Sequence, residues 1–329
     1  MQTRPLARTG IQVSPLGLGT WVLGGPFATG DTPLGWGATD DDEARRVLRA
    51  ALDAGITLFD TADAYGAGHA ERLLGEAVRG RRDEVVIVTK WSNTIDEARR
   101  RLTGVDTSPG YVRRALDASL RRLGTDRVDV YLLHASDLPV GRAQELLPVL
   151  EDLVAEGKLR AYGWSTDDPA RAASWAGQPG CAATEFELNV LEDKPELVAL
   201  CEDAGLLGLC RGPLAMGLLG GRYRAGTQIG ADDVRGRQAP AWMRWFRDGR
   251  PDPDAVAAVD ALRDVLTSGG RTLAQGALAW IWARSPALVP IPGARTVAQL
   301  EDNAGALAHG PLGTDELRQI DAILAGSAA

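Results

Sequence analysis

An alternation of short apolar runs with amphipathic segments constrains the fold of this 329-residue chain more than any other feature. The run ITLFD at 56–60 precedes a helical pattern at 70–80, and EVVIVTK at 84–90 precedes another at 108–124. Further apolar runs lie at 15–21, 128–134, 159–165, 182–188, 206–212 and 287–293. Such runs are typical of parallel strands that helices cover on one or both faces. Eight strand-and-helix steps predict an α/β fold, a (β/α)8 or TIM barrel, as a single domain over residues 1–329.

Helix start and stop signals support this alternation. Thr39 or Asp40 can cap a helix within 39–55, while Ser108 and Gly124 suit the two ends of the helix at 108–124. Residues 4–14 predict a β-hairpin. Further helical patterns occupy 143–157, 168–176, 194–205 and 272–285.

Composition excludes several classes of function. The net charge of −8 disfavours a nucleic-acid surface or a polybasic membrane patch. Three cysteines without metal-ligand spacing predict reduced, buried thiols. We find neither an apolar signal core nor a stretch of about 18 apolar residues, and therefore expect a cytoplasmic protein.

One long segment, residues 222–253, has no sustained helix or strand period. Loops of this length are usually functional, and this one follows an expected barrel strand. It also carries aromatic residues, among them Trp242 and Trp245, that could contact a ligand. We expect a lid over the barrel mouth, although a surface loop that packs its own aromatics is an alternative.

Four chemically active side chains stand at or just after expected strands: Asp60, Tyr65, Lys90 and His134. The carboxyl ends of barrel strands ring one pocket, so these four side chains should meet there. Each residue alone has an ordinary structural explanation, such as core packing, capping or a solvated tip. Together they form an acid–base set.

This set suits carbonyl reduction, which needs a hydride at carbon and a proton at oxygen. Tyrosine is a weak acid, with an unperturbed pKa of about 10, and a nearby ammonium lowers that pKa. Lys90 can supply the ammonium, Asp60 can hold it, and His134 can polarise the substrate oxygen. We therefore predict Tyr65 as the general acid.

The same motifs resemble the aldo-keto reductase superfamily. FDTADAYG carries Asp60 and Tyr65, VTK carries Lys90, and LLH carries His134. The segments GPLAMGLLGGRY and IPGARTVAQLEDNAGAL are also similar, and the resemblance spans residues 1 to 310. It implies an oxidoreductase whose N-terminal hairpin closes the barrel bottom, which uses NADPH (NADP+), with NADH possible, and which needs no metal.

The resemblance also implies where the cofactor binds. A pyrophosphate loop is expected over 211–222, and Arg295 is expected near the adenosine 2′-phosphate because it opens a helix whose N-terminus suits an anion. In place of a stacking aromatic the chain has Arg211, and Ser165, Thr166 and Glu185 stand where a Ser, an Asn and a Gln often hold the nicotinamide carboxamide. The full set of cofactor candidates is Thr20, Trp21, Asp60, Ser165, Thr166, Glu185, Arg211, Gly212, Pro213, Leu214, Gly217, Arg222, Gly293, Arg295, Gln299 and Asn303.

Tryptophan is unusually frequent, with nine residues. We expect Trp21, Trp91, Trp242 and Trp245 to line the substrate pocket and to favour aryl or apolar carbonyls, or sugar faces. The expected activity is NADPH-dependent reduction of a small-molecule aldehyde or ketone. Two alternatives remain: a sugar-specific keto or enoyl reductase of a biosynthetic pathway, and a slow-turnover regulatory subunit that senses cofactor.

Overall fold

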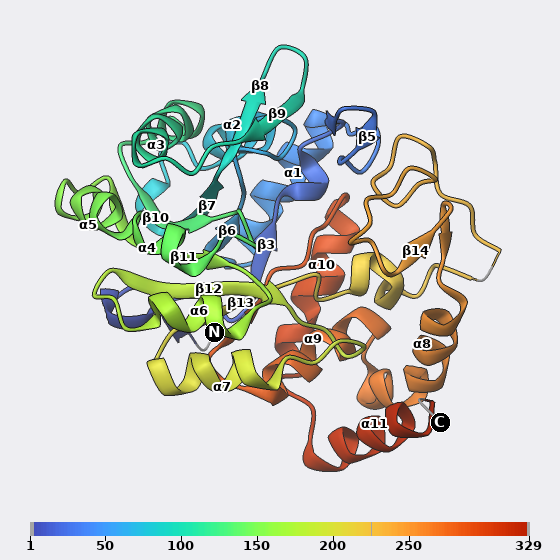
Figure 1. Ribbon diagram of the computed structural model, residues 1–329. Coiled ribbons are helices and arrows are strands. Elements are labelled where there is room, and N and C mark those ends of the chain that lie inside the picture. The colour runs from blue at the N-terminus through green and yellow to red at the C-terminus, as the bar shows by residue number, and fades with distance from the viewer. Residues whose placement is uncertain (1–2, 225, 328–329) are drawn as a thin grey trace.

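The computed structural model describes residues 3–224 and 226–327, and its centre is an eight-stranded parallel sheet (Figure 1). In spatial order the strands are β3 (Gly17–Gly19), β6 (Leu58–Asp60), β7 (Val86–Trp91), β10 (Val128–Leu133), β11 (Leu159–Ser165), β12 (Cys181–Glu187), β13 (Leu207–Arg211) and β16 (Leu288–Pro290). A parallel bridge between Gly19 and Gly293 joins the two outermost strands. The predicted barrel is therefore confirmed, and all eight expected strands take part in it.

Closure of the barrel depends on glycine. A Cβ atom on Gly19 would lie 2.8 Å from the carbonyl oxygen of Ile291, which is too close for any side chain. The Gly19 N–H instead donates to the Pro292 carbonyl over 3.1 Å. Absence of a side chain thus allows the first and last strands to approach.

Helices surround the strands (Figure 1). They are α1 (Asp41–Asp53), α2 (His69–Ala77), α3 (Pro109–Leu123), α4 (Val140–Gln144), α5 (Leu147–Ala155), α6 (Pro169–Ala176), α7 (Pro195–Ala204), α8 (Pro253–Leu266), α9 (Leu273–Arg284), α10 (Val297–Gly305) and α11 (Thr314–Ser327). Short 3-10 turns are η1 (Ala7–Thr9), η2 (Trp21–Leu23), η3 (Arg82–Glu84), η4 (Ala215–Gly220), η5 (Ser268–Gly270) and η6 (Ala306–Ala308). Asp40 and Ser108 cap α1 and α3, as the sequence predicts.

A second, four-stranded sheet was not predicted. It consists of β5 (Thr32–Pro33), β4 (Ala28–Thr29), β9 (Arg101–Val105) and β8 (Asn93–Asp96). The β8–β9 hairpin begins two residues after β7 and projects from its carboxyl end (Figure 1). It brings residues from the first and third barrel loops together beside the expected active site.

The long loop at 222–253 is largely irregular in its described part and contains only the short pair β14 (Phe246–Arg247) and β15 (Arg250–Pro251). Arg235 fixes it in place, since its guanidinium lies 4.2 Å from the Trp36 ring centroid and pairs with Asp233. The same guanidinium donates to the Met216 carbonyl over 3.0 Å. One buried arginine therefore ties this loop to the segment after β3 and to η4.

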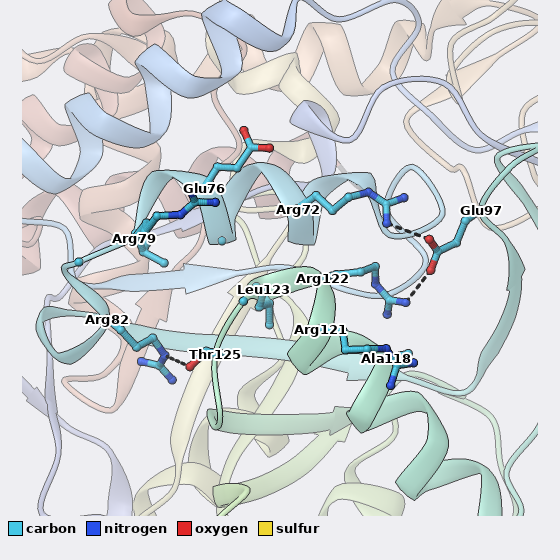
Figure 2. Close-up of a pocket in the computed structure, with 14 residues that line it drawn as sticks. Arg72, Glu76, Arg79, Arg82, Glu97, Ala118, Arg121, Arg122, Leu123 and Thr125 are labelled. Carbon is cyan, nitrogen blue, oxygen red and sulfur yellow. Dashed lines mark hydrogen bonds and ion pairs between the residues drawn. The ribbon is translucent and has the colours of Figure 1, made fainter.

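A cleft of about 520 Å³ lies on the outer wall, between α2 and α3 (Figure 2). Five arginines line it, and Glu97 pairs with both Arg72 and Arg122. Arg82 is held by Asp129. None of the expected catalytic residues lines this cleft, so we do not assign the active site to it.

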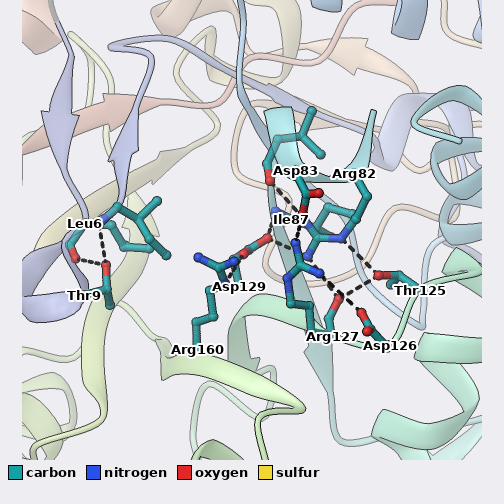
Figure 3. A network of polar contacts seen from close by, with 12 residues as sticks. Leu6, Thr9, Arg82, Asp83, Ile87, Thr125, Asp126, Arg127, Asp129 and Arg160 are labelled. Atoms are coloured by element: carbon teal, nitrogen blue, oxygen red, sulfur yellow. Dashed lines mark hydrogen bonds and ion pairs between the residues drawn. The ribbon is translucent and has the colours of Figure 1, made fainter. Parts of the chain in front are cut away.

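The amino-terminal ends of the barrel strands are covered by the N-terminal hairpin of β1 (Arg4–Pro5) and β2 (Gln12–Val13). Leu6 and Val13 are buried against barrel-interior residues such as Val86 and Val130, which confirms the prediction of a bottom plug. Beside it, the buried carboxylate of Asp129 accepts from the Ile87 N–H over 2.8 Å and pairs with Arg82 and Arg160 (Figure 3).

Candidate active site

Lys90 lies at the centre of the candidate site. It projects from β7, its side chain is fully buried, and its Nζ donates to Asp60 Oδ1 on neighbouring β6 over 2.6 Å. A second hydrogen bond runs to the Thr61 carbonyl over 3.1 Å. These contacts fix the ammonium at the carboxyl end of the barrel.

Tyr65 and His134 complete the expected set. The Lys90 ammonium lies 3.3 Å from the Tyr65 hydroxyl and 5.1 Å from the Tyr65 ring centroid. The His134 ring stands edge-on to the Tyr65 ring, with centroids 6.0 Å apart at 87°. Both rings are partly exposed, whereas Asp60 and Lys90 are buried beneath them. The four side chains predicted to meet do meet.

Glu185 is an unexpected member of this cluster. Its Oε2 lies 3.2 Å from Lys90 Nζ, and its Oε1 accepts a hydrogen bond from Ser165 over 3.0 Å. The side chain is 1% exposed. The sequence predicted it beside a carboxamide, but not as an ion-pair partner of Lys90. Its position on an expected barrel strand was the available signal.

Two carboxylates beside one ammonium change the electrostatics. Burial would lower the pKa of Lys90, but Asp60 and Glu185 outweigh it and raise that pKa above its ordinary value. Burial and the charge of Glu185 raise the pKa of Asp60 well above its usual range, against the effect of Lys90.

Tyr65 differs from the expectation. Burial raises its pKa above the ordinary value, and Lys90 offsets this only in part, since Asp60 and Glu185 act in the opposite direction. The predicted net lowering of the Tyr65 pKa is therefore wrong. The main physical reason is the burial of the phenol, and the second is that the ammonium charge is shared with two carboxylates.

His134 is neutral in this setting. Burial, followed by the charges of Lys90 and Arg211, lowers its pKa to about 3. The Asn93 amide nitrogen lies 3.5 Å from His134 Nδ1. If that amide donates, Nδ1 is the acceptor and Nε2 carries the proton, an assignment made from the hydrogen-bond pattern. Asn93, which the sequence analysis missed, comes from the unpredicted hairpin.

The residues expected near the nicotinamide are already engaged with one another. Thr166 donates from its hydroxyl to the Ser136 carbonyl over 2.8 Å. Arg211 pairs with Asp167 and lies 3.7 Å from Glu187. Arg211 thus stands at the rim as a fixed cation.

The expected pyrophosphate loop has an unusual backbone. Ala215, Met216 and Gly217 all have positive φ, at 46°, 54° and 94°, and Gly212 has φ 60°. Non-glycine residues rarely adopt this conformation, and it concentrates at functional sites. Arg222 at the end of the segment is exposed and donates to the Tyr223 hydroxyl over 2.6 Å.

Arg295 is not free for a phosphate. Its guanidinium donates to the carbonyls of Trp36 and Ala38 over 2.9 and 2.6 Å. At the same helix start, the Val297 N–H donates to the carboxylate of Glu43 over 3.0 Å. The start of α10 therefore already holds an anion from α1, and the expected 2′-phosphate contact is not preformed.

Two other residues of this segment keep simpler roles. Gln299 accepts from the Arg295 backbone N–H over 2.8 Å. Asn303 is 3% exposed, near the carboxyl end of α10. Its expected contact with an adenine stays a prediction.

The tryptophans separate into two groups. Trp21 stacks near Tyr65, with ring centroids 6.0 Å apart at 20°, and Trp242 from the long loop lies 6.1 Å from Trp21. Trp242 is 56% exposed. Trp91, by contrast, is fully buried against Tyr131, and Trp245 is 8% exposed with its N–H on Glu187. The structure thus removes Trp91 from the expected substrate wall.

The family model described as "Aldo/keto reductase family" matches residues 15–325. The chain belongs to the aldo-keto reductase family. Members of this family are oxidoreductases, and the resemblance inferred from the motifs is confirmed.

Individual aldo-keto reductases match along nearly the whole chain. "Aldo-keto reductase YhdN" of Bacillus subtilis is 31% identical over 92% of this chain and 87% of its own length. The "NADH-specific methylglyoxal reductase" of Escherichia coli is 30% identical over 93% and 94% of the two chains. A solved aldo-keto reductase from Klebsiella pneumoniae, in complex with NADP and acetate, is 28% identical, with a TM-score of 0.69 over 98% and 96%.

No helix in the described residues has both the length and the apolar character needed to span a bilayer.

Proposed function

We propose that this protein is an NAD(P)H-dependent carbonyl reductase that converts an aldehyde or ketone to an alcohol. The observation that carries the proposal is the Tyr65 hydroxyl 3.3 Å from a buried Lys90 ammonium that Asp60 holds. A neutral His134 ring beside that hydroxyl adds a hydrogen-bond donor to the same point.

The proposed chemistry divides between cofactor and protein. A reduced nicotinamide, when bound, supplies the hydride for the carbonyl carbon. Tyr65 gives its proton to the carbonyl oxygen, and Lys90 stabilises the phenolate that remains. The Nε2–H of His134 donates to the same oxygen and orients the carbonyl. Asp60 is a positioning residue, because it holds the ammonium in place.

The residues fit a dinucleotide at several points. The buried Thr20 Oγ1 has no hydrogen-bond partner in the described chain. We assign the pyrophosphate to the left-handed segment within Gly212–Gly217. Ser165, Thr166, Glu185 and Arg211 would surround the nicotinamide, and the start of α10 the adenosine ribose. Relatives named for NADP and for NADH support either cofactor.

For the substrate we propose a small carbonyl compound with an apolar or flat face. Trp21 and the exposed Trp242 would form its walls, and residues 222–253 would cover it. A sugar carbonyl suits the same aromatic faces. We place this reaction in the cytoplasm, within a single-domain chain.

A second candidate function is a slow reductase that acts as a cofactor sensor. The raised pKa of Tyr65 favours this function, since burial and two carboxylates make the phenol a weaker acid. Rapid mixing with NADPH and a reactive aldehyde separates the two functions. A fast burst of NADPH oxidation supports the reductase, whereas a persistent NADPH complex supports the sensor.

Substitution of Tyr65 tests the proposal directly. Tyr65→Phe should lower carbonyl reduction by at least about 100-fold, because general acid catalysis contributes roughly that much or more. NADPH affinity, measured by tryptophan fluorescence, should change little. Retention of most turnover in this variant would overturn the assignment of the acid.

A further inference from the structure

The Lys90 site places two carboxyl groups beside one ammonium. Lys90 Nζ contacts Asp60 Oδ1 at 2.6 Å and Glu185 Oε2 at 3.2 Å, and both carboxylates are nearly inaccessible to water. When all three groups are ionised, their sum is one negative charge. In a dry site such a charge acts strongly on its neighbours.

The cation beside Glu185 is Lys90, and the carboxyl group of Asp60 lies within hydrogen-bond reach of Glu185. Its Oε1 accepts from the neutral Ser165 hydroxyl, and its Oε2 makes no hydrogen bond in the described structure. The ammonium is the cation next to that oxygen. A glutamine could accept the same Ser165 hydrogen bond, so the hydrogen bond alone does not require an acid at this position.

We propose that Glu185 is a second counter-ion of Lys90, a positioning residue that shares the ammonium with Asp60 and keeps the proton on Tyr65. This inference rests on the proposed function for its catalytic consequence: the site is set for slow proton donation. A neutral side chain at Glu185 would restore the full effect of the ammonium on the phenol.

The other charged groups around Tyr65 do not supply the same control. Asp60 on β6 is the nearer counter-ion, and Asp63 lies buried in the following turn. His134, after β10, is neutral, with its pKa lowered to about 3 by burial and by Lys90 and Arg211. Arg211 at the end of β13 is paired with Asp167 and Glu187. Neutralising Glu185 removes one carboxylate from beside the Lys90 ammonium and leaves the ion pair between Asp60 and Lys90 in place.

Titration of the cofactor-free protein tests this proposal without any need for turnover. Tyrosinate absorbance is followed as pH rises in the wild type and in Glu185→Gln, each with a matching Tyr65→Phe background that isolates Tyr65. We expect Tyr65 in Glu185→Gln to ionise at least about one pH unit lower than in the wild type. Identical Tyr65 titrations would overturn the proposal.

Two variants separate charge from packing. Glu185→Met removes both the charge and the hydrogen-bond acceptor, and it should shift Tyr65 in the same direction as Glu185→Gln. A shift in Glu185→Met alone would indicate a packing effect and contradict the proposal. Glu187→Gln is the matched control, because this carboxylate lies on the same strand but contacts Arg211, Arg244 and Trp245; it should leave the Tyr65 titration unchanged.

The pH profile of carbonyl reduction gives the second readout. In Glu185→Gln the alkaline limb of kcat/KM should move to lower pH together with the tyrosinate titration. If no carbonyl compound is reduced by either protein, the proposed function fails while the titration still decides the role of Glu185. If reduction is observed and neither the titration nor the limb moves, the role of Glu185 fails alone.

Discussion

Lys90 is one of three lysines in a chain whose cationic residues are otherwise arginines. Its fully buried ammonium contacts an aspartate, a glutamate, a carbonyl and a phenol. A planar guanidinium is larger and directs its donors in a fixed fork, so it would not fit this compact arrangement. The rarity of lysine was therefore a useful signal of chemistry.

Glu43 is expected to influence the preference between NADPH and NADH. Its carboxylate accepts from Val297 N–H at the start of α10, where a 2′-phosphate would meet it. Glu43→Gln keeps an acceptor for that N–H and removes the charge. The ratio of NADPH to NADH affinity should rise about 3- to 10-fold, because a carboxylate at a helix N-terminus repels a second anion there.

Fluorescence titration of both cofactors measures this ratio. Asp42→Asn is the matched control, because Asp42 lies on the same turn of α1 but pairs with Arg45 and is exposed. Its ratio should equal that of the wild type. An unchanged ratio in Glu43→Gln would show that Glu43 does not oppose the 2′-phosphate.

The sequence could predict which residues reach the barrel mouth, but not all of their contacts. Asp60, Lys90 and His134 were found because each ends an apolar strand, and that position alone fixes the rim on which it lies. The Glu185–Lys90 pair joins strands that are far apart in sequence, and its distance depends on side-chain rotamers. Trp91 was misassigned because successive strand residues point to opposite faces, and it points into the core.

Among the elements, the barrel bottom is built for stability. Asp129 at the start of β10 accepts from Ile87 N–H and pairs with Arg82 and Arg160 (Figure 3). Asp129→Ala should destabilise the protein by about 2 to 4 kcal/mol, because it leaves a buried N–H and an arginine without their acceptor. Urea unfolding measures this loss.

Asp126→Ala is the control for that measurement. Asp126 is exposed and pairs weakly with Arg127 at 3.4 Å, so its loss should cost less than about 1 kcal/mol. Cofactor binding should be unchanged in both variants, since Asp129 lies at the end of the strands away from Lys90. Equal stability of the two variants would contradict a structural role for Asp129.

The sheet of β5, β4, β9 and β8 shows what element-level prediction missed. Its strands are short, and the residues at 93–96 and 101–105 mix polar and charged types without an apolar alternation. The local sequence pattern therefore predicts loops rather than strands in these two segments. Their pairing depends on the two barrel loops already being held side by side, which no local pattern encodes.

For the whole molecule, eight repeated strand–helix units determined the architecture, and the architecture brought the catalytic side chains together. The start of α10 could not be predicted in this way, because the hydrogen bond from Val297 N–H to Glu43 joins the first helix to a late one that packs beside it only once the barrel is closed. Closure itself follows from the glycines at Gly17 and Gly19, where a Cβ would collide with the neighbouring strands.

The most direct test of the whole account is a tryptophan-quenching titration of the purified protein with NADPH and, in parallel, with NADH. Trp21 lies beside Tyr65 and Trp242 lies beside Trp21, so a nicotinamide bound there should quench tryptophan fluorescence. We predict saturable quenching with micromolar or tighter affinity for at least one cofactor. Absence of binding by both would contradict the proposed reductase, whatever the geometry of Asp60, Tyr65, Lys90 and His134.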